Sequence, residues 1–100
     1  MSQKVNICGL EHTVKYYDDA FNVDEHWGMI DFAKCEIKIN KDMNLAAQEE
    51  TLCHEIVHGI LVHIGYDELS QDEKFVQALG NAIFQSFTVK KVQDEYEQRT

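Results

Sequence analysis

Residues 45–65 read LAAQEETLCHEIVHGILVHIG, a stretch without proline in which apolar residues recur at helical spacing. Asn44 precedes it and can cap a helix, and Gly65 is a natural stop. The sequence therefore predicts a helix over residues 44–65. Its apolar stripe is expected to contain Leu45, Leu52, Ile56, Ile60 and either Leu61 or Ile64.

The residues before this helix have the alternation of β-strands. VNICGL (5–10) and HTVKYY (12–17) are short β-prone segments, and residues 9–11 between them suggest a hairpin. In CEIKIN (35–40), Cys35, Ile37 and Ile39 alternate with polar residues, which predicts a half-buried antiparallel or edge strand. The acidic stretch 18–28 has no steady period, so we expect a loop there with at most a short helical turn.

A second helix is expected after the first. Ser70 is a good N-cap, and Glu73 three residues later completes a capping box, so this helix is predicted over residues 70–88. The tail 90–100 is mostly polar. One hundred residues make one domain, and strands followed by helices indicate an α+β fold. We predict about three strands in a small antiparallel or mixed sheet, mostly within residues 1–43, followed by two main helices. The buried stripe of the second helix is expected to contain Phe75, Val76, Leu79, Ile83 and Phe87.

The composition is that of a soluble globular protein, with 44% hydrophobic and 27% charged residues. A formal charge of −9 argues against nucleic acid as the partner, because phosphate binding depends on Lys and Arg. No apolar run approaches the ~18 residues of a membrane span, and the first residues lack the profile of a signal peptide. We expect a cytoplasmic protein, with no membrane partner and with its three scattered cysteines reduced.

HEIVH (54–58) fits the pattern H-E-x-x-H inside the first predicted helix. Residues four apart lie on one face, about 6 Å along the axis, so His54 and His58 can bind a single Zn²⁺. Glu55 is then placed beside the ion, within reach of a water molecule on it, and can act as a general base. With the His and Glu frequencies of this chain, roughly 0.02 matches are expected by chance. The alternative is two surface histidines and a solvated glutamate.

A tetrahedral zinc site needs a third protein ligand. His63 is nine residues from His54, half a turn out of phase, so it faces the opposite side of a continuous helix. The remaining candidates are carboxylates at or before the start of the second helix. Helical phase slightly favours Asp72, and the longer side chain favours Glu73. These carboxylates are Asp67, Glu68, Asp72 and Glu73.

HEIVH, followed fifteen residues later by EKFVQALGNAIF (73–84), resembles the small gluzincin-type metallopeptidases of phages and mobile elements, relatives of the ImmA/IrrE type. The resemblance implies a zincin-like fold with one Zn²⁺ per chain, held by His54, His58 and Glu73, with Glu55 as the general base. It implies hydrolysis of a polypeptide, with CEIKIN as the edge strand that pairs with the substrate. If the chain is phage-encoded, its compartment would be the bacterial host cytosol.

HGILVHIGYDE (58–68) also resembles the signature of bacterial metalloendoribonucleases. His58, Gly65 and Asp67 fall in register, but Val62 and Glu68 stand where that signature has histidine ligands. A metal-dependent endoribonuclease is therefore the least favoured function. The main alternative to a peptidase is a metal-binding regulatory or interaction protein that retains a vestigial protease fold.

Zincins usually place a His or Tyr opposite the metal to stabilise the oxyanion. Nothing in the spacing selects among the candidates. Trp27 and the phenylalanines are expected in the core rather than in the pocket. The oxyanion candidates are His12, Tyr16, Tyr17, His26, His63 and Tyr66.

Overall fold

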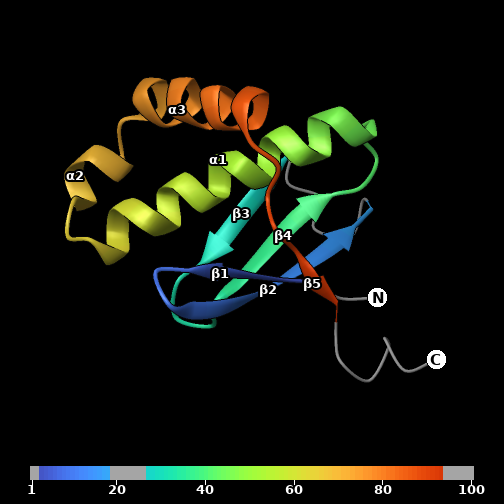
Figure 1. The fold of residues 1–100 in the computed structure, drawn as a ribbon, viewed down its shortest axis with the longest axis horizontal. Coiled ribbons are helices and arrows are strands. Elements are labelled where there is room, and N and C mark those ends of the chain that lie inside the picture. The colour runs from blue at the N-terminus through green and yellow to red at the C-terminus, as the bar shows by residue number, and fades with distance from the viewer. Residues whose placement is uncertain (1–2, 19–26, 94–100) are drawn as a thin grey trace.

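The computed structural model describes residues 3–18 and 27–93 and confirms an α+β architecture (Figure 1). Helix α1 lies on one face of the sheet, and α3 lies over α1 on the side away from the strands. The expected count of about three strands and two helices was too low: in the described part of the chain, four strands precede the helices, a two-residue strand follows them, and one short helix joins the two long ones. The elements are β1 (Gln3–Ile7), β2 (Leu10–Tyr17), β3 (Gly28–Asp31), β4 (Glu36–Asn40), α1 (Leu45–His63), α2 (Asp67–Ser70), α3 (Glu73–Ser86) and β5 (Val92–Gln93).

The sheet is mixed, with the strand order β3-β4-β2-β1-β5. β2 and β4 are parallel and the other neighbours are antiparallel. The β1–β2 hairpin turns at Cys8 and Gly9, earlier than residues 9–11, and both residues have positive φ, +53° and +87°. Two such residues suit the tight turn of a two-residue hairpin. The acidic loop expected over 18–28 falls largely on residues 19–26, outside the described residues.

Of the two alternatives for CEIKIN, the edge strand was wrong, whereas antiparallel pairing is present between β4 and β3. β4 lies between β3 and β2, and the edge beside α1 belongs to β3. The alternation itself is present, because Ile37 and Ile39 are fully buried and the residues between them are not. In a sheet with one covered face, interior and edge strands alternate in the same way, so the pattern could not separate them.

The core forms where α1 covers one face of the sheet. Buried side chains from three strands pack there against Leu52 of α1, which is fully buried. The opposite face is polar and carries ion pairs such as Lys15–Glu36 at 2.9 Å. Among residues 3–18 and 27–93, helices cover one face of the sheet only, so we look for the site on the helical side or at an edge. The buried strand residues of this core are Val5, Ile7, Val14, Ile37 and Ile39.

Helix α1 is packed on two sides. Leu52 contacts the sheet, while Val57 and Leu61 form a second cluster with Val76 of α3. The predicted cap is confirmed, since the Asn44 side chain accepts a hydrogen bond from the Ala47 N–H at 2.8 Å. Leu45 and Ile64, expected in the stripe, lie at the helix ends and are exposed. The third side of α1, which carries the H-E-x-x-H residues, is left for the cleft.

Helix α3 begins at Glu73, not at residue 70. Asp72 is its N-cap and accepts a hydrogen bond from the Phe75 N–H at 3.1 Å, whereas Ser70 is buried in α2. A capping box between Ser70 and Glu73 is therefore ruled out. The cause is α2. This short helix includes Ser70, the residue at which the sequence pattern predicted the start of the second helix.

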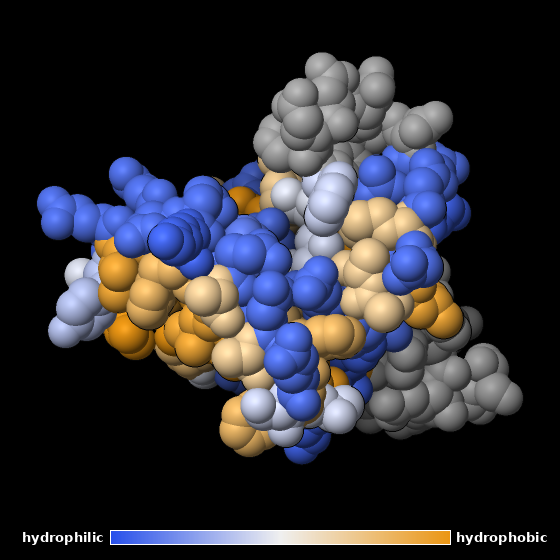
Figure 2. All heavy atoms as spheres, turned by 90° about the horizontal axis from the view of Figure 1, so that it is seen from above, coloured by the Kyte–Doolittle hydropathy of each residue, from blue (hydrophilic) through white to orange (hydrophobic). Residues whose placement is uncertain are grey.

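The predicted stripe of α3 was also partly wrong, because Phe75, Leu79 and Phe87 are exposed and only Val76 and Gly80 are buried. A Cβ on Gly80 would lie 3.1 Å from the Cα of His54, so α3 approaches α1 along a line centred on this glycine. The face seen in Figure 2, which looks down on the helices, accordingly shows apolar side chains interspersed with hydrophilic ones. Within residues 3–18 and 27–93, no helix has the length and apolarity needed to cross a bilayer.

Candidate metal centre

Three potential metal ligands from two helices meet at one point. His54 and His58 project from successive turns of α1, and Glu73 is the first residue of α3. One ligand atom from each of the three lies within 4.8 Å of the others, so the group could hold a metal ion. The helix start separates Asp72 from Glu73, because the Asp72 carboxylate caps α3 whereas the Glu73 carboxylate belongs to the three-residue group. Glu73 lies in line with Val76 and Gly80, the residues that face α1.

The distances in this group suit a small cation. The Nε2 atom of His54 lies 3.1 Å from one carboxylate oxygen of Glu73, and the Nε2 atom of His58 lies 3.3 Å from the other. Two ligands that each lie about 2 Å from a tetrahedral ion are about 3.3 Å apart. The distances between the Glu73 oxygens and the two Nε2 atoms are therefore close to those expected for ligands that share one ion.

The other ring nitrogens are held by neutral side chains. The Nδ1 atom of His54 lies 2.8 Å from the Gln77 amide oxygen, and the Nδ1 atom of His58 lies 3.1 Å from the Ser70 hydroxyl. Ser70 donates its own proton to the His58 carbonyl, and the Gln77 amide nitrogen donates to Asn81, so both oxygens are placed to accept from Nδ1–H. This tautomer leaves both Nε2 lone pairs facing Glu73. Such partners orient ligand histidines in metal sites.

Burial lowers the pKa of His58, which keeps its imidazole neutral around pH 7. A neutral ring is what a metal ligand must be. The unprotonated Nε2 atoms of the two histidines face the carboxylate oxygens of Glu73, and all of these atoms are hydrogen-bond acceptors. A proton or a cation between them would relieve their repulsion. The donor set of two imidazoles and one carboxylate is typical of zinc, with a fourth position left for water or substrate.

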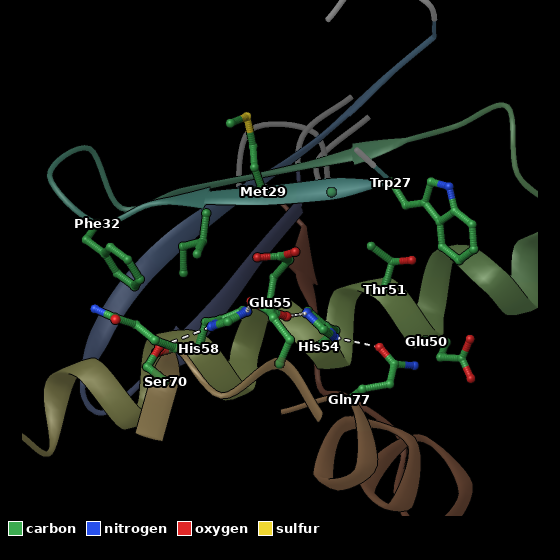
Figure 3. Close-up of a pocket in the computed structure, with 14 residues that line it drawn as sticks. Trp27, Met29, Phe32, Glu50, Thr51, His54, Glu55, His58, Ser70 and Gln77 are labelled. Carbon is green, nitrogen blue, oxygen red and sulfur yellow. Dashed lines mark hydrogen bonds and ion pairs between the residues drawn. The ribbon is translucent and has the colours of Figure 1, made fainter. Parts of the chain in front are cut away.

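Glu55 is a buried carboxylate beside this group. Only 6% of its surface is exposed, and burial, followed by the charge of Glu73, raises its pKa to about 7. Among the described residues, no side chain or backbone group forms a hydrogen bond with it. The carboxyl oxygens are not among the buried side-chain atoms that lack a partner, so they open onto the cleft, where water or a ligand can bond to them. Figure 3 shows Glu55 pointing from α1 toward β3, between the two histidines.

The group lies in a cleft of about 670 Å³ between β3, α1 and the start of α3. The prediction that Trp27 and the phenylalanines belong to the core was wrong for Trp27 and Phe32, which line this cleft and are 61% and 41% exposed. Figure 3 places Trp27 at the end near Thr51 and Phe32 at the end near Ser70, with His54 and His58 between them. Trp27 flanks a stretch without periodicity, so no sequence signal placed it in the cleft.

The cleft runs along the open edge of the sheet. The Asn40 N–H donates to the Trp27 carbonyl at 2.8 Å, and Gly28 is paired with Ile39. In an antiparallel ladder, hydrogen-bonded and non-bonded pairs alternate, so the backbone groups of Gly28 and Ile30 point away from β4. No other described strand pairs with this edge of β3, so it offers backbone donors and acceptors on the side of the cleft.

None of the described oxyanion candidates lines the cleft. His63 contacts His12, with ring centroids 5.8 Å apart, on the side of α1 away from the metal ligands, as its helical phase predicted. The Tyr16 hydroxyl donates to Gln3, and Tyr66 lies beside α2. His26 lies outside the described residues.

His12 is fully buried, and its Nε2 atom has no hydrogen-bond partner in the described chain. Its Nδ1 atom lies 3.0 Å from the Leu10 carbonyl. Sequence reasoning also missed the two residues that hold the ligand histidines, Ser70 and Gln77. Their only signal is tertiary, because they are 12 and 23 residues away from their partners along the chain.

A search of family models, of curated proteins and of solved structures found no match to this chain. The geometry of the site is therefore the basis for its function.

Proposed function

We propose that this chain is a zinc-dependent metallopeptidase of the zincin-like, gluzincin type, with His54, His58 and Glu73 as ligands. The observation that carries the proposal is Glu55, a largely buried residue whose carboxyl group has no protein partner and opens onto the cleft beside a three-ligand group. A structural role would have given this carboxylate a donor. Placed between the ligands and the edge strand, it suits a base that acts on a water molecule in the cleft.

When bound, a zinc ion would supply a strongly acidified water and polarise the carbonyl under attack. Glu55 takes the proton of the attacking water and then delivers it to the leaving amine. Its carboxyl group opens onto the cleft beside the three ligands, which is where a base for the attacking water must lie. Gln77 and Ser70 keep the two imidazoles in the tautomer that binds the ion.

The proposed substrate is an extended polypeptide. The free backbone groups of Gly28 and Ile30 can pair with a strand laid into the cleft, which would place a peptide bond over the ligands. Apolar contact is available from Trp27 and Phe32, at opposite ends of the cleft.

One observation favours a second function, a metal-binding regulatory or interaction protein without hydrolysis. Over residues 3–18 and 27–93, no His, Tyr, Lys or Arg apart from the two ligand histidines lines the cleft, so a strong oxyanion donor is missing there. The same cleft could then hold a bound segment of a partner protein without cleaving it.

The first experiment is metal analysis of the purified protein after zinc loading. We expect about one zinc per chain, lost in His54→Ala and in Glu73→Ala. Asp72→Ala is the matched control, because it removes a neighbouring carboxylate that caps α3 and should leave the zinc content unchanged. Loss of zinc in Asp72→Ala with retention in Glu73→Ala would reverse the ligand assignment.

The second experiment compares the zinc-loaded chain with Glu55→Gln on unfolded polypeptides. Wild type should cleave them, and Glu55→Gln should keep its zinc and lose at least a hundredfold in rate. Equal activity in the two proteins would remove Glu55 from catalysis. Tight peptide binding without cleavage in either protein would favour the regulatory function, and cleavage of RNA alone would favour an endoribonuclease.

A further inference from the structure

Trp27 and Glu50 occupy the same end of the cleft. Figure 3 shows the indole of Trp27 above Thr51, and the side chain of Glu50 beyond His54 on the same side of the metal ligands. Trp27 is 61% exposed although it is the one tryptophan of the chain, and Glu50 is half-buried in α1. A large aromatic face left open in the same end of a cleft as a carboxylate is a surface that a ligand can cover.

The charges that line the cleft are all negative. Its lining contains Glu50, Glu55 and Glu73, and no Lys or Arg from the described residues. Glu73 faces the two histidines, and Glu55 is the proposed base. Glu50 has no ion-pair or hydrogen-bond partner in the described chain, whereas its neighbour Glu49 is paired with Lys91. After the metal site is complete, Glu50 is the carboxylate that remains uncompensated in the cleft.

We propose that the Trp27–Glu50 end of the cleft is a subsite for a cationic side chain, arginine or lysine, of the bound polypeptide. The proposal rests on the peptide-binding function of the cleft and adds its specificity. A cation over the face of an indole is attracted by the ring quadrupole, and a nearby carboxylate adds Coulomb attraction in a partly desolvated site. A guanidinium group suits both partners, because it is planar and stacks on aromatic rings.

The opposite end of the cleft differs in chemistry. Phe32 lies there near Ser70, and Figure 3 labels no carboxylate at that end. An aromatic ring without a nearby charge suits an apolar or neutral side chain. The cleft therefore distinguishes its two ends, and the basic residue of a bound peptide belongs at the Trp27 end.

Binding can be measured at Trp27 itself. It is the single tryptophan in the sequence, so a change in tryptophan fluorescence reports on this end of the cleft. The zinc-loaded Glu55→Gln protein is titrated with the pentapeptides Ala-Ala-X-Ala-Ala, in which X is Arg, Met or Glu. We expect the Arg peptide to bind about tenfold more tightly than the Met peptide and to change the fluorescence, with the Glu peptide weakest.

Adding Glu50→Gln should reduce the preference for Arg over Met to about threefold, and Trp27→Leu, followed by calorimetry, should reduce it similarly. Glu68→Gln is the matched control: it removes the same charge from an exposed residue of α2 that does not line this cleft, so the preference should stay tenfold.

Equal binding of the Arg and Met peptides would overturn the subsite, and so would a tenfold preference that is unchanged in Glu50→Gln. These results are independent of whether the wild-type chain hydrolyses the same peptides, which is measured separately and decides the peptidase function. If the peptides bind as expected and none is cleaved, the subsite stands and the hydrolytic function falls. If no peptide binds, both the subsite and the cleft as a peptide site are refuted.

Discussion

Glu55→Gln should change how the stability of the metal-free protein depends on pH. In the folded chain, burial raises the pKa of Glu55 to about 7 from the ordinary value of 4.5. Below pH 4.5 the carboxyl group is protonated in both the folded and unfolded states and carries no penalty. As the pH rises toward 7, the unfolded state loses this proton first, so the free energy of unfolding falls. Above pH 7 the full penalty remains.

The magnitude follows from the difference between the two pKa values, about 2.5 units. At 1.36 kcal/mol per unit, ionisation of Glu55 costs the metal-free fold up to about 3 kcal/mol. That is a large part of the 5–15 kcal/mol expected for a domain. Glutamine has the shape of a protonated glutamate and never ionises, so the variant should escape the penalty.

The assay is urea unfolding of both proteins in EDTA between pH 4.5 and 8. The two should be about equally stable at pH 4.5, and Glu55→Gln should be more stable by up to about 3 kcal/mol at pH 8. Groups that both proteins share cancel in this difference. Glu68→Gln, an exposed residue, serves as control and should follow wild type at every pH. A constant difference between wild type and Glu55→Gln across this range would refute the buried, unpartnered state of Glu55.

Three further outcomes are expected. Ser70→Ala and Gln77→Leu should each weaken zinc binding about 10–100-fold in a competition assay with a chelator, because each releases one ligand imidazole. Gly80→Ala should destabilise the protein by about 1–3 kcal/mol in urea unfolding and weaken zinc binding, since its Cβ would meet the His54 backbone. Gly59→Ala is the control, because its Cβ would meet isoleucine side chains and no backbone atom. If zinc affinity were unchanged in both Gly59→Ala and Gly80→Ala, the role given to Gly80 would be refuted. Asn44→Ala should cost about 1 kcal/mol in thermal unfolding and leave zinc affinity unchanged, because it removes only the cap of α1.

The elements that the sequence predicted well depend on local spacing. The first helix, its Asn44 cap and the common face of His54 and His58 follow from the geometry of one helix, in which each residue adds 100°. The same rule placed His63 on another side, where it contacts His12. The buried alternation of Ile37 and Ile39 follows equally from strand geometry.

The errors concern residues whose environment depends on a second element. Phe75 and Leu79 share the apolar period of α3, yet the close approach at Gly80 turns them toward solvent. The start of α3 moved to Glu73 because α2 forms a turn of its own before it. Local propensity carries no information about how closely two helices approach.

The sequence by itself determined the α+β class, the α1 helix and the two histidines with Glu55 beside them, because these follow from periodicities within single segments. Tertiary structure alone decided that Glu73 completes the group while Asp72 caps α3, and that β3 rather than β4 forms the open edge. It alone also placed Trp27 with Glu50 at one end of the cleft. These facts depend on the distance and angle between elements far apart in the chain, which are set by packing in three dimensions and leave no period in the sequence.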